Sequence, residues 1–329
     1  LRLELLYNRL NVFMWLATFF FGLGAVLLLL QFASLLRPSL SFKWVMRIGY
    51  TLLFAGFLYH TFGLILRWLI AGHAPWSNGY ESMIFIGWCI LLAGFVMARK
   101  SSMVLPITGV FTGVVLMVAH LSWMNPHITN LVPVLQSYWL TLHVSIIIGG
   151  YGFLALGALL GFLNLVIMVF RTKRNIMRLQ LTVDELTAIN EMALTVGLYL
   201  MTIGSFIGGV WANESWGRYW GWDPKETWSL ITIVLYAFIL HMRFVPGLKG
   251  SMAFNIGSLI TFSSVIMTYL GVNYYLAGLH SYAGGDPVPI PAFVWYTLAV
   301  VIALIYMARK NEQKYLPLRQ KHSENNQLE

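Results

Sequence analysis

The sequence is poor in charged residues and contains almost no cysteine. Only 10% of its 329 residues are charged, whereas 58% are hydrophobic. Soluble domains carry about 25% charged residues, so this balance excludes an ordinary soluble protein. The one cysteine, Cys89, lies in an apolar run. This excludes a disulfide framework and a redox-active thiol pair.

Several motifs that would indicate a nucleotide, zinc or covalent haem site are also absent. The sequence has no GxxxxGK[ST] phosphate loop, no zinc-type cluster of Cys and His, and no CxxCH haem-attachment site. ATP hydrolysis, a structural zinc centre and identity as a c-type cytochrome are therefore unsupported.

Long apolar runs dominate what is present. Runs of about 20 residues cross the roughly 30 Å hydrocarbon core of a bilayer as helices, and this sequence predicts an all-α polytopic membrane protein with about nine transmembrane helices. The predicted spans are 13–36, 48–71, 83–98, 103–122, 138–170, 192–211, 227–245, 252–277 and 291–308. The first run is too long for a signal-peptide core. The fifth is over-long, and Gly149 and Gly150 permit a bend or tilt there.

The basic residues predict the orientation of these spans. Sixteen of the 21 Lys and Arg residues fall in alternate connections and the tail, four fall on the other side, and Arg67 lies within a span. Lys and Arg mark cytoplasmic loops. The N-terminus is therefore expected outside and the C-terminus in the cytoplasm. The protein is expected in the cytoplasmic (inner) membrane. The net charge of +9 is explained by these loops, and no nucleic-acid partner is expected.

The predicted organisation has three parts. Residues 1–12 form an outward segment, 13–309 a transmembrane domain and 310–329 a cytoplasmic tail. Within the cytoplasmic connection 172–191, Thr182 and Glu185 have the spacing of a capping box, which predicts a short helix, "TVDELTAINEMAL", that leads into the sixth span.

A polar, ring-rich loop separates two apolar runs on the outer side. It reads "WANESWGRYWGWDPKETW", residues 211–228, and holds five of the thirteen tryptophans. Asp223, Pro224 and Glu226 have the pattern of a helix N-cap, with proline at the first helical position. If capping is the main role of Asp223, Asn or Ser at this position retains function, because both residues cap well.

The tryptophans allow two interpretations. Trp211 and Trp228 lie at span ends, where Trp commonly anchors a helix in the membrane interface. The run Trp216, Trp220 and Trp222 alternates with glycines, which suits a flat apolar ligand. Arg218 and Lys225 would accept acidic groups on that ligand. Haem, with two propionates on a flat ring, fits this pattern. Quinones, lipids and structural packing are the alternatives.

Three histidines have positions that suit a haem ligand, which is commonly a neutral imidazole. His143 and His280 both reach the outer face that carries the loop, so together they suit a bis-histidine site. His241 lies about 21 Å along a helix from the outer surface, at 1.5 Å per residue. An ionisable group at that depth is a candidate by default. His60 is a second intramembrane histidine and ranks below His241.

These segments resemble a known family. The stretch "WANESWGRYWGWDPKETWSLITIVLYAFILHMR" resembles the tryptophan-rich WWD signature of haem-handling proteins of cytochrome c biogenesis, specifically the CcsA-type subunit of the System II cytochrome c synthase. The segments "PWSNGYESMIFIGW" (75–88) and "GLHSY" (278–282) are similar to that family too. The similarity extends over most of residues 45–309.

The resemblance implies a site and partners. His143 and His280 would ligate haem iron at the outer face, and His241 would ligate a second haem within the bilayer. The other intramembrane ligand would come from a CcsB-type membrane subunit, either separate or fused upstream. A start at Leu1 with an outward N-terminus suits such a fusion.

The resemblance also implies an activity. The protein would be a cytochrome c synthase that moves haem b to the outer face and attaches it to the CxxCH motif of apocytochrome c. Trp216, Trp220, Trp222 and Asp223 would hold haem for reaction, supported by a set of binding residues: Trp211, Arg218, Lys225 and Trp228. The alternatives are a haem exporter or chaperone without ligation chemistry, and a quinone-linked membrane oxidoreductase subunit.

Overall fold

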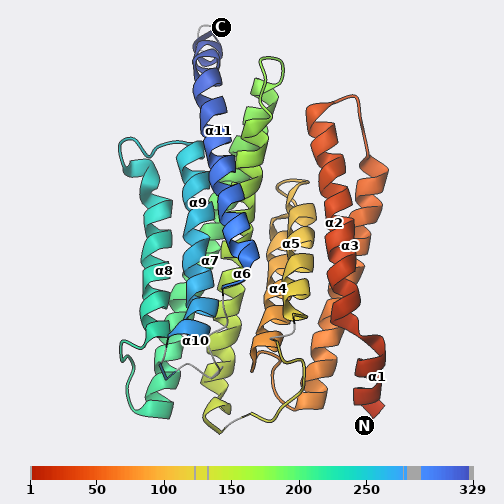
Figure 1. Cartoon of the computed structure of the whole chain (residues 1–329), viewed down its shortest axis with the longest axis vertical. Coiled ribbons are helices and arrows are strands. Elements are labelled where there is room, and N and C mark those ends of the chain that lie inside the picture. Colours follow the sequence, from red (N-terminus) through yellow and green to blue (C-terminus); the bar gives the residue numbers. More distant parts are fainter. Residues whose placement is uncertain (1, 122–123, 132, 277, 280–289, 326–329) are drawn as a thin grey trace.

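The computed structural model describes the chain except residues 1, 122–123, 132, 277, 280–289 and 326–329. Every regular element in the described residues is a helix (Figure 1). Eight of these helices are long and apolar enough to cross a membrane, and the shorter apolar helix Val104–Ala119 is a ninth candidate. The prediction of an all-α, multi-pass membrane protein is therefore confirmed.

Most of the helices follow the predicted spans, and α7 and α11 extend well beyond theirs. Their bounds are α1 Arg2–Leu10, α2 Val12–Leu36, α3 Lys43–Ala71, α4 Gly79–Met97, α5 Val104–Ala119, α6 Tyr138–Val169, α7 Ile176–Trp216, α8 Pro224–His241, α9 Ser251–Ile266, α10 Val272–Tyr275 and α11 Ala292–Asn325. A π-helical turn, Met267–Gly271, joins α9 to α10. Helix α6 runs without interruption past Gly149 and Gly150, and an added Cβ at Gly150 would lie 3.3 Å from the carbonyl oxygen of Gly197 on α7. Gly150 therefore serves close packing of the two helices.

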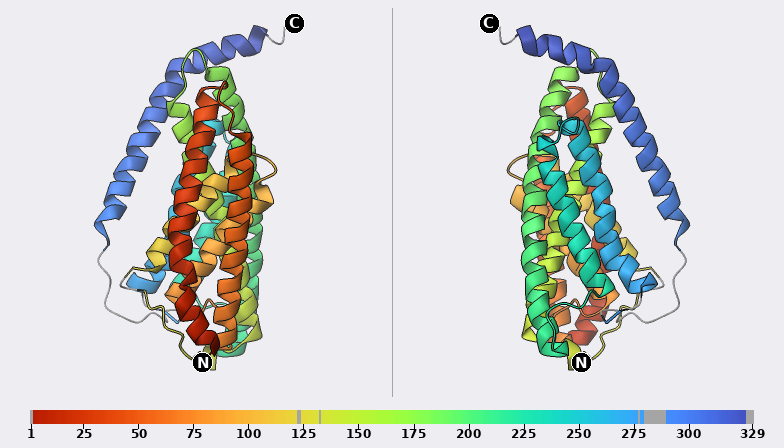
Figure 2. Two further views of the ribbon diagram at one scale, coloured as in Figure 1. Left: turned by 90° about the vertical axis from the view of Figure 1, so that its right-hand side faces the viewer. Right: turned by 90° about the vertical axis from the view of Figure 1, so that its left-hand side faces the viewer.

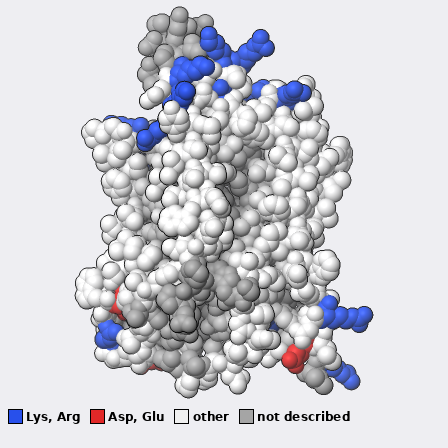
Figure 3. Space-filling model, viewed as in Figure 1, with Lys and Arg blue, Asp and Glu red and all other residues white. Residues whose placement is uncertain are grey.

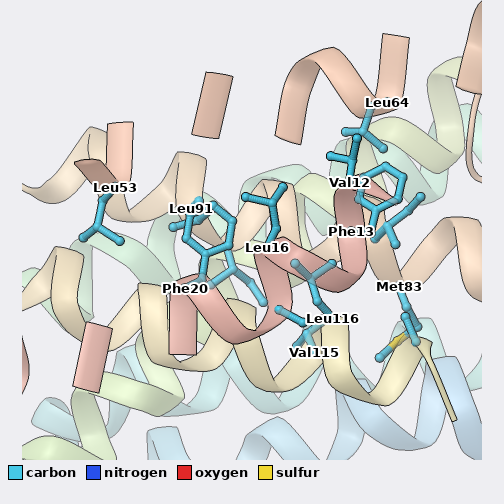
Figure 4. Close-up of a cluster of buried hydrophobic side chains, with 14 of the residues drawn as sticks. Val12, Phe13, Leu16, Phe20, Leu53, Leu64, Met83, Leu91, Val115 and Leu116 are labelled. Atoms are coloured by element: carbon cyan, nitrogen blue, oxygen red, sulfur yellow. The ribbon is translucent and has the colours of Figure 1, made fainter. Parts of the chain in front are cut away.

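The bundle is arranged around the long antiparallel pair α6 and α7. Helices α2–α5 pack on one side of this pair and α8–α9 on the other (Figure 1). The side formed by α2–α5 has its own apolar core, a cluster that includes Phe13 and Phe20 of α2, Leu53 of α3 and Leu116 of α5 (Figure 4). The two ends of the chain lie at opposite ends of the bundle.

The basic side chains gather at the end of the molecule where the C-terminus lies, as Figure 3 shows for one face. The opposite end, which holds the N-terminus and residues 211–228, carries few of them. The positive-inside rule assigns the basic end to the cytoplasm. We therefore expect the tryptophan-rich loop to face outward, and we call its end of the bundle the outer end.

The prediction that a short helix begins with a capping box at Thr182 is wrong. Helix α7 is continuous from Ile176 to Trp216, and its N-cap position is Asn175. Thr182 does not cap a helix; its hydroxyl donates to the carbonyl oxygen of Arg178 at 3.4 Å. The helix continues because one face of this segment is apolar and buried against the bundle, at Leu179, Val183, Leu186 and Ile189. That spacing is one helical stripe.

Helix α11 extends well past the predicted last span, into the segment expected to be a tail. Its C-terminal half contacts the turn after α6. Glu312 forms an ion pair with Arg171, and the Asn311 amide donates to the carbonyl oxygens of Met168 and Val169 at 3.0 and 2.8 Å. Its other half leans away from the bundle (Figure 2).

A buried ion pair ties the outer ends of several elements together. The Arg67 Nε donates to Glu81 Oε1 at 2.8 Å, and both side chains are 0% exposed. The same guanidinium donates to the Tyr7 hydroxyl and to the carbonyl oxygen of Pro126, at 3.0 and 2.9 Å. Glu81 Oε2 accepts from the backbone N–H of Ser77 at 2.8 Å. The pair therefore joins α1, α3, α4 and the segment after α5.

Removing one partner of this pair leaves an uncompensated buried charge. We expect Arg67→Ala to lower the free energy of unfolding by about 3–5 kcal/mol, measured by denaturant unfolding in detergent. The double variant Arg67→Met with Glu81→Leu should recover part of the loss, because it buries no charge. The exposed pair Arg243–Glu191 is the matched control, and Arg243→Ala should cost less than about 1 kcal/mol. Equal losses for Arg67→Ala and Arg243→Ala would refute the structural role of the buried pair.

Candidate functional site

The loop between α7 and α8 is held by two helix-end motifs. Helix α7 ends at Trp216, and Gly217 takes the left-handed conformation (φ 70°) that commonly ends a helix. Helix α8 begins with the predicted capping box, in which Asp223 Oδ1 accepts from the backbone N–H of Lys225 at 2.9 Å. The N-cap interpretation of Asp223 is confirmed.

Trp222 has an unusual backbone conformation within this loop. Its φ is 58°, in the left-handed region that side chains rarely adopt, and such a residue costs about 1–3 kcal/mol. Glu226 Oε2 stabilises it from both sides, accepting from the backbone N–H groups of Gly221 and Asp223 at 2.8 and 3.1 Å. The capping box thus holds a strained residue whose ring is 70% exposed.

The loop tryptophans form two edge-on pairs and not one flat surface. Trp211 is 1% exposed and meets Trp216 with ring centroids 4.7 Å apart at 66°. Trp220 and Trp222 are exposed and perpendicular, with centroids 5.8 Å apart. Trp228 is half-buried on α8, and its carbonyl oxygen lies 3.2 Å from the Thr268 hydroxyl. The five rings therefore differ in burial and orientation and do not form a single platform.

Next to this loop the outer end of the bundle encloses a large chamber of about 1400 Å³. It exceeds the roughly 300–1,000 Å³ of pockets for drug-sized ligands. Its walls come from the α3–α4 connection, the segment before α6, the start of α6, and the π turn with α10. Trp68 near the end of α3 and Trp76 in the α3–α4 connection line it on one side, and Trp211 lines it from the loop.

His143 lies in the wall of this chamber. Its Nδ1–H donates to the carbonyl oxygen of Gly204 on α7 at 2.7 Å, so the lone pair of the neutral ring lies on Nε2. This is the arrangement that orients histidine for metal ligation. An added Cβ at Gly208 would lie 2.6 Å from the ring, so α7 makes room for this imidazole. His143 also lines a second pocket of about 60 Å³, shared with Tyr219 and Trp220.

Lys225, at the start of α8, lines the same two pockets as His143. It lines both the chamber and the small pocket, and its Nζ donates to Asn273 Oδ1 at 2.8 Å. Asn273 comes from α10, and Tyr269 and Leu270 of the preceding π turn also line the chamber. Among the described lining residues Lys225 is the only one with a Lys, Arg, Asp or Glu side chain. Arg218 does not line it; its guanidinium lies over Gly221, where an added Cβ would be 0.8 Å from Nη1.

Of the other two predicted ligands, the structure describes only His241. His280 falls outside the described residues. His241 is the last residue of α8 and is exposed, at the end of the helix away from the chamber. Its Nδ1–H donates to the carbonyl oxygen of Ala237 at 2.7 Å, which again leaves the lone pair on Nε2. Two residues further on, Arg243 pairs with Glu191.

His60 is a core histidine. It is 0% exposed, its Nε2–H donates to the carbonyl oxygen of Ile84 at 3.0 Å, and the Phe13 ring lies 5.4 Å away. It lines neither the chamber nor the small pocket. His73 does line the chamber, but both of its ring nitrogens lie close to backbone carbonyl oxygens, those of Ala74 and Thr129, at 3.1 and 3.0 Å.

Comparison with known proteins identifies the family. The family model described as cytochrome C assembly protein matches residues 76–280. The chain belongs to the cytochrome c assembly protein family. This match covers the α3–α4 wall from Trp76, together with His143, the tryptophan-rich loop and His241. Trp68 and His73 of the chamber wall lie before the matched region.

Individual relatives agree with the family model. The chain is 48% identical to protein NrfI of Wolinella succinogenes over 290 residues, which is 88% of this chain and 32% of NrfI. It is 36% identical to the cytochrome c biogenesis protein CcsA of Chlorella vulgaris over 259 residues, 68% of this chain and 81% of that protein. It is 37% identical to CcsA of Chlamydomonas reinhardtii over 233 residues, covering 67% and 64%. The chain thus spans about a third of the length of NrfI.

Sequence reasoning missed several residues of this site. Gly208 makes room for His143, Asn273 receives Lys225, and Trp68 with Trp76 forms a chamber wall. The similarity of "PWSNGYESMIFIGW" to the family pointed to the segment that contains Trp76. It did not place that segment in the chamber wall. The neighbouring glycines in "GSFIGG" on α7 are the signal for a close approach there, because glycine permits contacts that a Cβ would block.

The chamber and the orientation can be tested together with introduced cysteines, since the native Cys89 is only 4% exposed. We expect Gln136→Cys, on the chamber wall, to react with a membrane-impermeant maleimide in intact right-side-out vesicles. Lys249→Cys, in the exposed connection at the other end, should react only after permeabilisation.

The wild-type protein, with Cys89 alone, should remain unlabelled in both conditions. Reversed labelling of the two variants would contradict the orientation. Labelling of Gln136→Cys only after denaturation would contradict an accessible outer chamber.

Proposed function

We propose that the protein delivers haem b across the cytoplasmic membrane and attaches it to the CxxCH motif of apocytochrome c at the outer face. The observation that carries this proposal is His143. It is a half-buried imidazole in the chamber wall, with Nδ1–H held by Gly204 and the lone pair on Nε2. A neutral imidazole so oriented is a common axial ligand of haem iron.

The surroundings of His143 fit the rest of the macrocycle. The chamber is large, and Trp68, Trp76 and Trp211 contribute apolar rings to its walls. Lys225 supplies one cationic group beside His143, which suits a propionate. Because the ring of Trp222 lines neither pocket, we assign Trp211 and Trp220 to haem contact before Trp222. Arg218 is assigned to the loop itself.

His241 and a partner would form the first haem site. Its imidazole is exposed at the last residue of α8, so a haem there would lie on the surface of this chain, with its second ligand supplied by another membrane segment. A CcsB-type subunit, separate or fused, is the proposed source. His280 is the proposed second ligand at the outer site, opposite His143.

The attachment reaction needs thiols, vinyl groups and positioning. Each cysteine S–H of the CxxCH motif adds across one haem vinyl group: sulfur bonds to the inner carbon and hydrogen ends on the terminal carbon, without net oxidation or loss of a group. Two aligned reactants held in one chamber gain a large rate advantage over free encounter. The histidine of the motif then replaces one axial ligand, which helps product release.

Two other functions make different predictions. A haem exporter or chaperone would bind haem and form no covalent haem–peptide adduct with an apocytochrome peptide. A quinone-linked oxidoreductase subunit would purify without haem. A CxxCH peptide added to the haem-loaded complex, followed by mass spectrometry for the adduct, separates these functions from a synthase.

The histidine assignments predict distinct losses of haem. In the protein purified with its membrane partner, His143→Ala should weaken haem binding at the outer site by more than about tenfold, because it removes a ligand fixed on a helix. His241→Ala should remove haem from the bilayer site. Added imidazole should partly restore each site, as read by the visible spectrum.

The controls come from the same chain. His73→Ala and His60→Ala should leave the haem spectrum of the folded protein unchanged, since neither imidazole is assigned to iron. Gly208→Ala should displace His143 and lower outer-site haem, whereas Gly149→Ala should not, because its Cβ would meet only Leu200 at 3.8 Å. Haem loss in His73→Ala equal to that in His143→Ala would refute the assignment.

A further inference from the structure

The π-helical turn after α9 fixes where α10 lies against α8. The hydroxyl of Thr268, in this turn, lies 3.0 Å from the Thr232 hydroxyl and 3.2 Å from the Trp228 carbonyl oxygen, both on α8. Such turns are rare and frequently occur at functional sites. Two residues after the turn, Asn273 of α10 meets the first turn of α8, where Lys225 Nζ donates to Asn273 Oδ1 at 2.8 Å.

This contact leaves donors of both side chains available to a ligand. Because an ammonium group only donates, the atom of Asn273 that meets Lys225 is the oxygen, and the amide nitrogen Nδ2 keeps its two N–H groups. In the described part of the chain, neither this Nδ2 nor the remaining N–H groups of the Lys225 ammonium have a hydrogen-bond partner. Both residues line the chamber and are half-buried.

The acids next to Lys225 already have partners. Asp223 Oδ1 and Oδ2 accept from the backbone N–H groups of Lys225 and Leu279, at 2.9 and 2.6 Å. Glu226 Oε2 accepts from the backbone N–H groups of Gly221 and Asp223, and Glu226 lines the small pocket and not the chamber. Lys225 forms no ion pair with an acid among the described residues. Its charge therefore remains available to an anion.

A cationic donor beside a neutral donor matches a carboxylate. The two oxygens of a carboxylate only accept hydrogen bonds, and bonds in which a partner is ionised are about twice as strong as neutral ones. One ammonium balances the single negative charge of one carboxylate. No Asp or Glu side chain is found among the described residues that line the chamber, so no lining acid repels such a ligand.

We propose that Lys225 and Asn273 form a carboxylate subsite of the chamber, which holds one propionate of the porphyrin. The inference rests on the proposed function, which supplies haem as the ligand of the chamber. The subsite selects porphyrins with a free carboxylate. Because the propionates and the vinyl groups lie on opposite edges of haem b, it also turns the reactive edge away from α8. Asn273 both contacts the propionate and positions Lys225.

Metal-free protoporphyrin IX tests the subsite without iron ligation, because it keeps both propionates and has no metal for an axial histidine. Its affinity is measured by fluorescence titration of the haem-free protein, purified with its membrane partner. Lys225→Met and Asn273→Ala should each weaken binding by about tenfold or more, since each removes a hydrogen bond to a charged group. Protoporphyrin IX dimethyl ester, which lacks the charge, should bind wild type and both variants equally weakly.

The variant Asn273→Asp separates binding of the carboxylate from support of Lys225. Asp has nearly the same size and keeps an oxygen toward Lys225, but it replaces the amide donor with a second acceptor. Protoporphyrin IX binding should fall at least as far as in Asn273→Ala, and binding of the ester should not change. Asn130→Ala is the matched control, because Asn130 is another amide of the chamber wall outside the subsite. This control should bind both porphyrins like wild type.

With haem, the subsite and the axial ligand give different signatures. Asn273→Asp should weaken haem binding, leave the visible spectrum at saturating haem unchanged, and gain nothing from added imidazole. His143→Ala should change the spectrum and respond to imidazole, and it should weaken protoporphyrin IX far less than haem. A double variant of Lys225→Met with Asn273→Ala should lose less than the sum of the two single losses, because the two side chains bind one group.

Three results would overturn the subsite. They are equal affinities of wild type for protoporphyrin IX and its dimethyl ester, wild-type affinity for protoporphyrin IX in Asn273→Asp, and a loss of the ester in the variants as large as that of the free acid. Haem binding that does not depend on His143 would instead contradict the proposed function. In that case protoporphyrin IX binding that still depends on Lys225 and Asn273 would leave the subsite standing.

Discussion

The structure depends on one constraint: in a bilayer, every backbone polar group must be paired within the protein. Irregular backbone is tolerated at membrane depth only where it is buried in protein or lines a water-filled cavity, and in this chain the chamber walls are formed where helices end. Each wall then needs its helix ends satisfied. Asp223 caps α8, the Asn78 side chain accepts from the Glu81 N–H at the start of α4, and Gly217 ends α7. The caps that satisfy the helices also shape the chamber.

Two kinds of polar contact hold these helix ends and helices in register. At the outer end, Arg67 and Glu81 connect α3 and α4 with the segment after α5. Deeper in the bundle, Asn255 of α9 accepts from the amides of Asn164 and Asn190, on α6 and α7, at 2.9 and 3.1 Å. Such contacts select one packing of apolar helices, which have little hydrophobic preference for each other in lipid. A ligand site shared by several helices needs that single packing.

The local features of the fold could be predicted from the sequence, and the long-range ones could not. Apolar runs predict the spans, and Asp223-Pro224 predicts the start of α8, because both depend on neighbouring residues. The continuity of α7 was missed because its early turns are stabilised by burial of Leu179 and Val183 against other helices. The chamber, the room made by Gly208 and the Asp223–Leu279 bond join residues far apart in sequence. A single sequence carries no signal of such pairings beyond a glycine or an unexplained acid.

The central claim is that haem at the outer face is held in this chamber by His143. The most direct measurement is a cryo-electron microscopy map of the haem-loaded protein with its membrane partner. The account predicts planar density inside the chamber, with iron at ligand distance from His143 Nε2 and a propionate near Lys225. Haem density confined to the flank beside His241, with protein side chains filling the chamber under saturating haem, would contradict it.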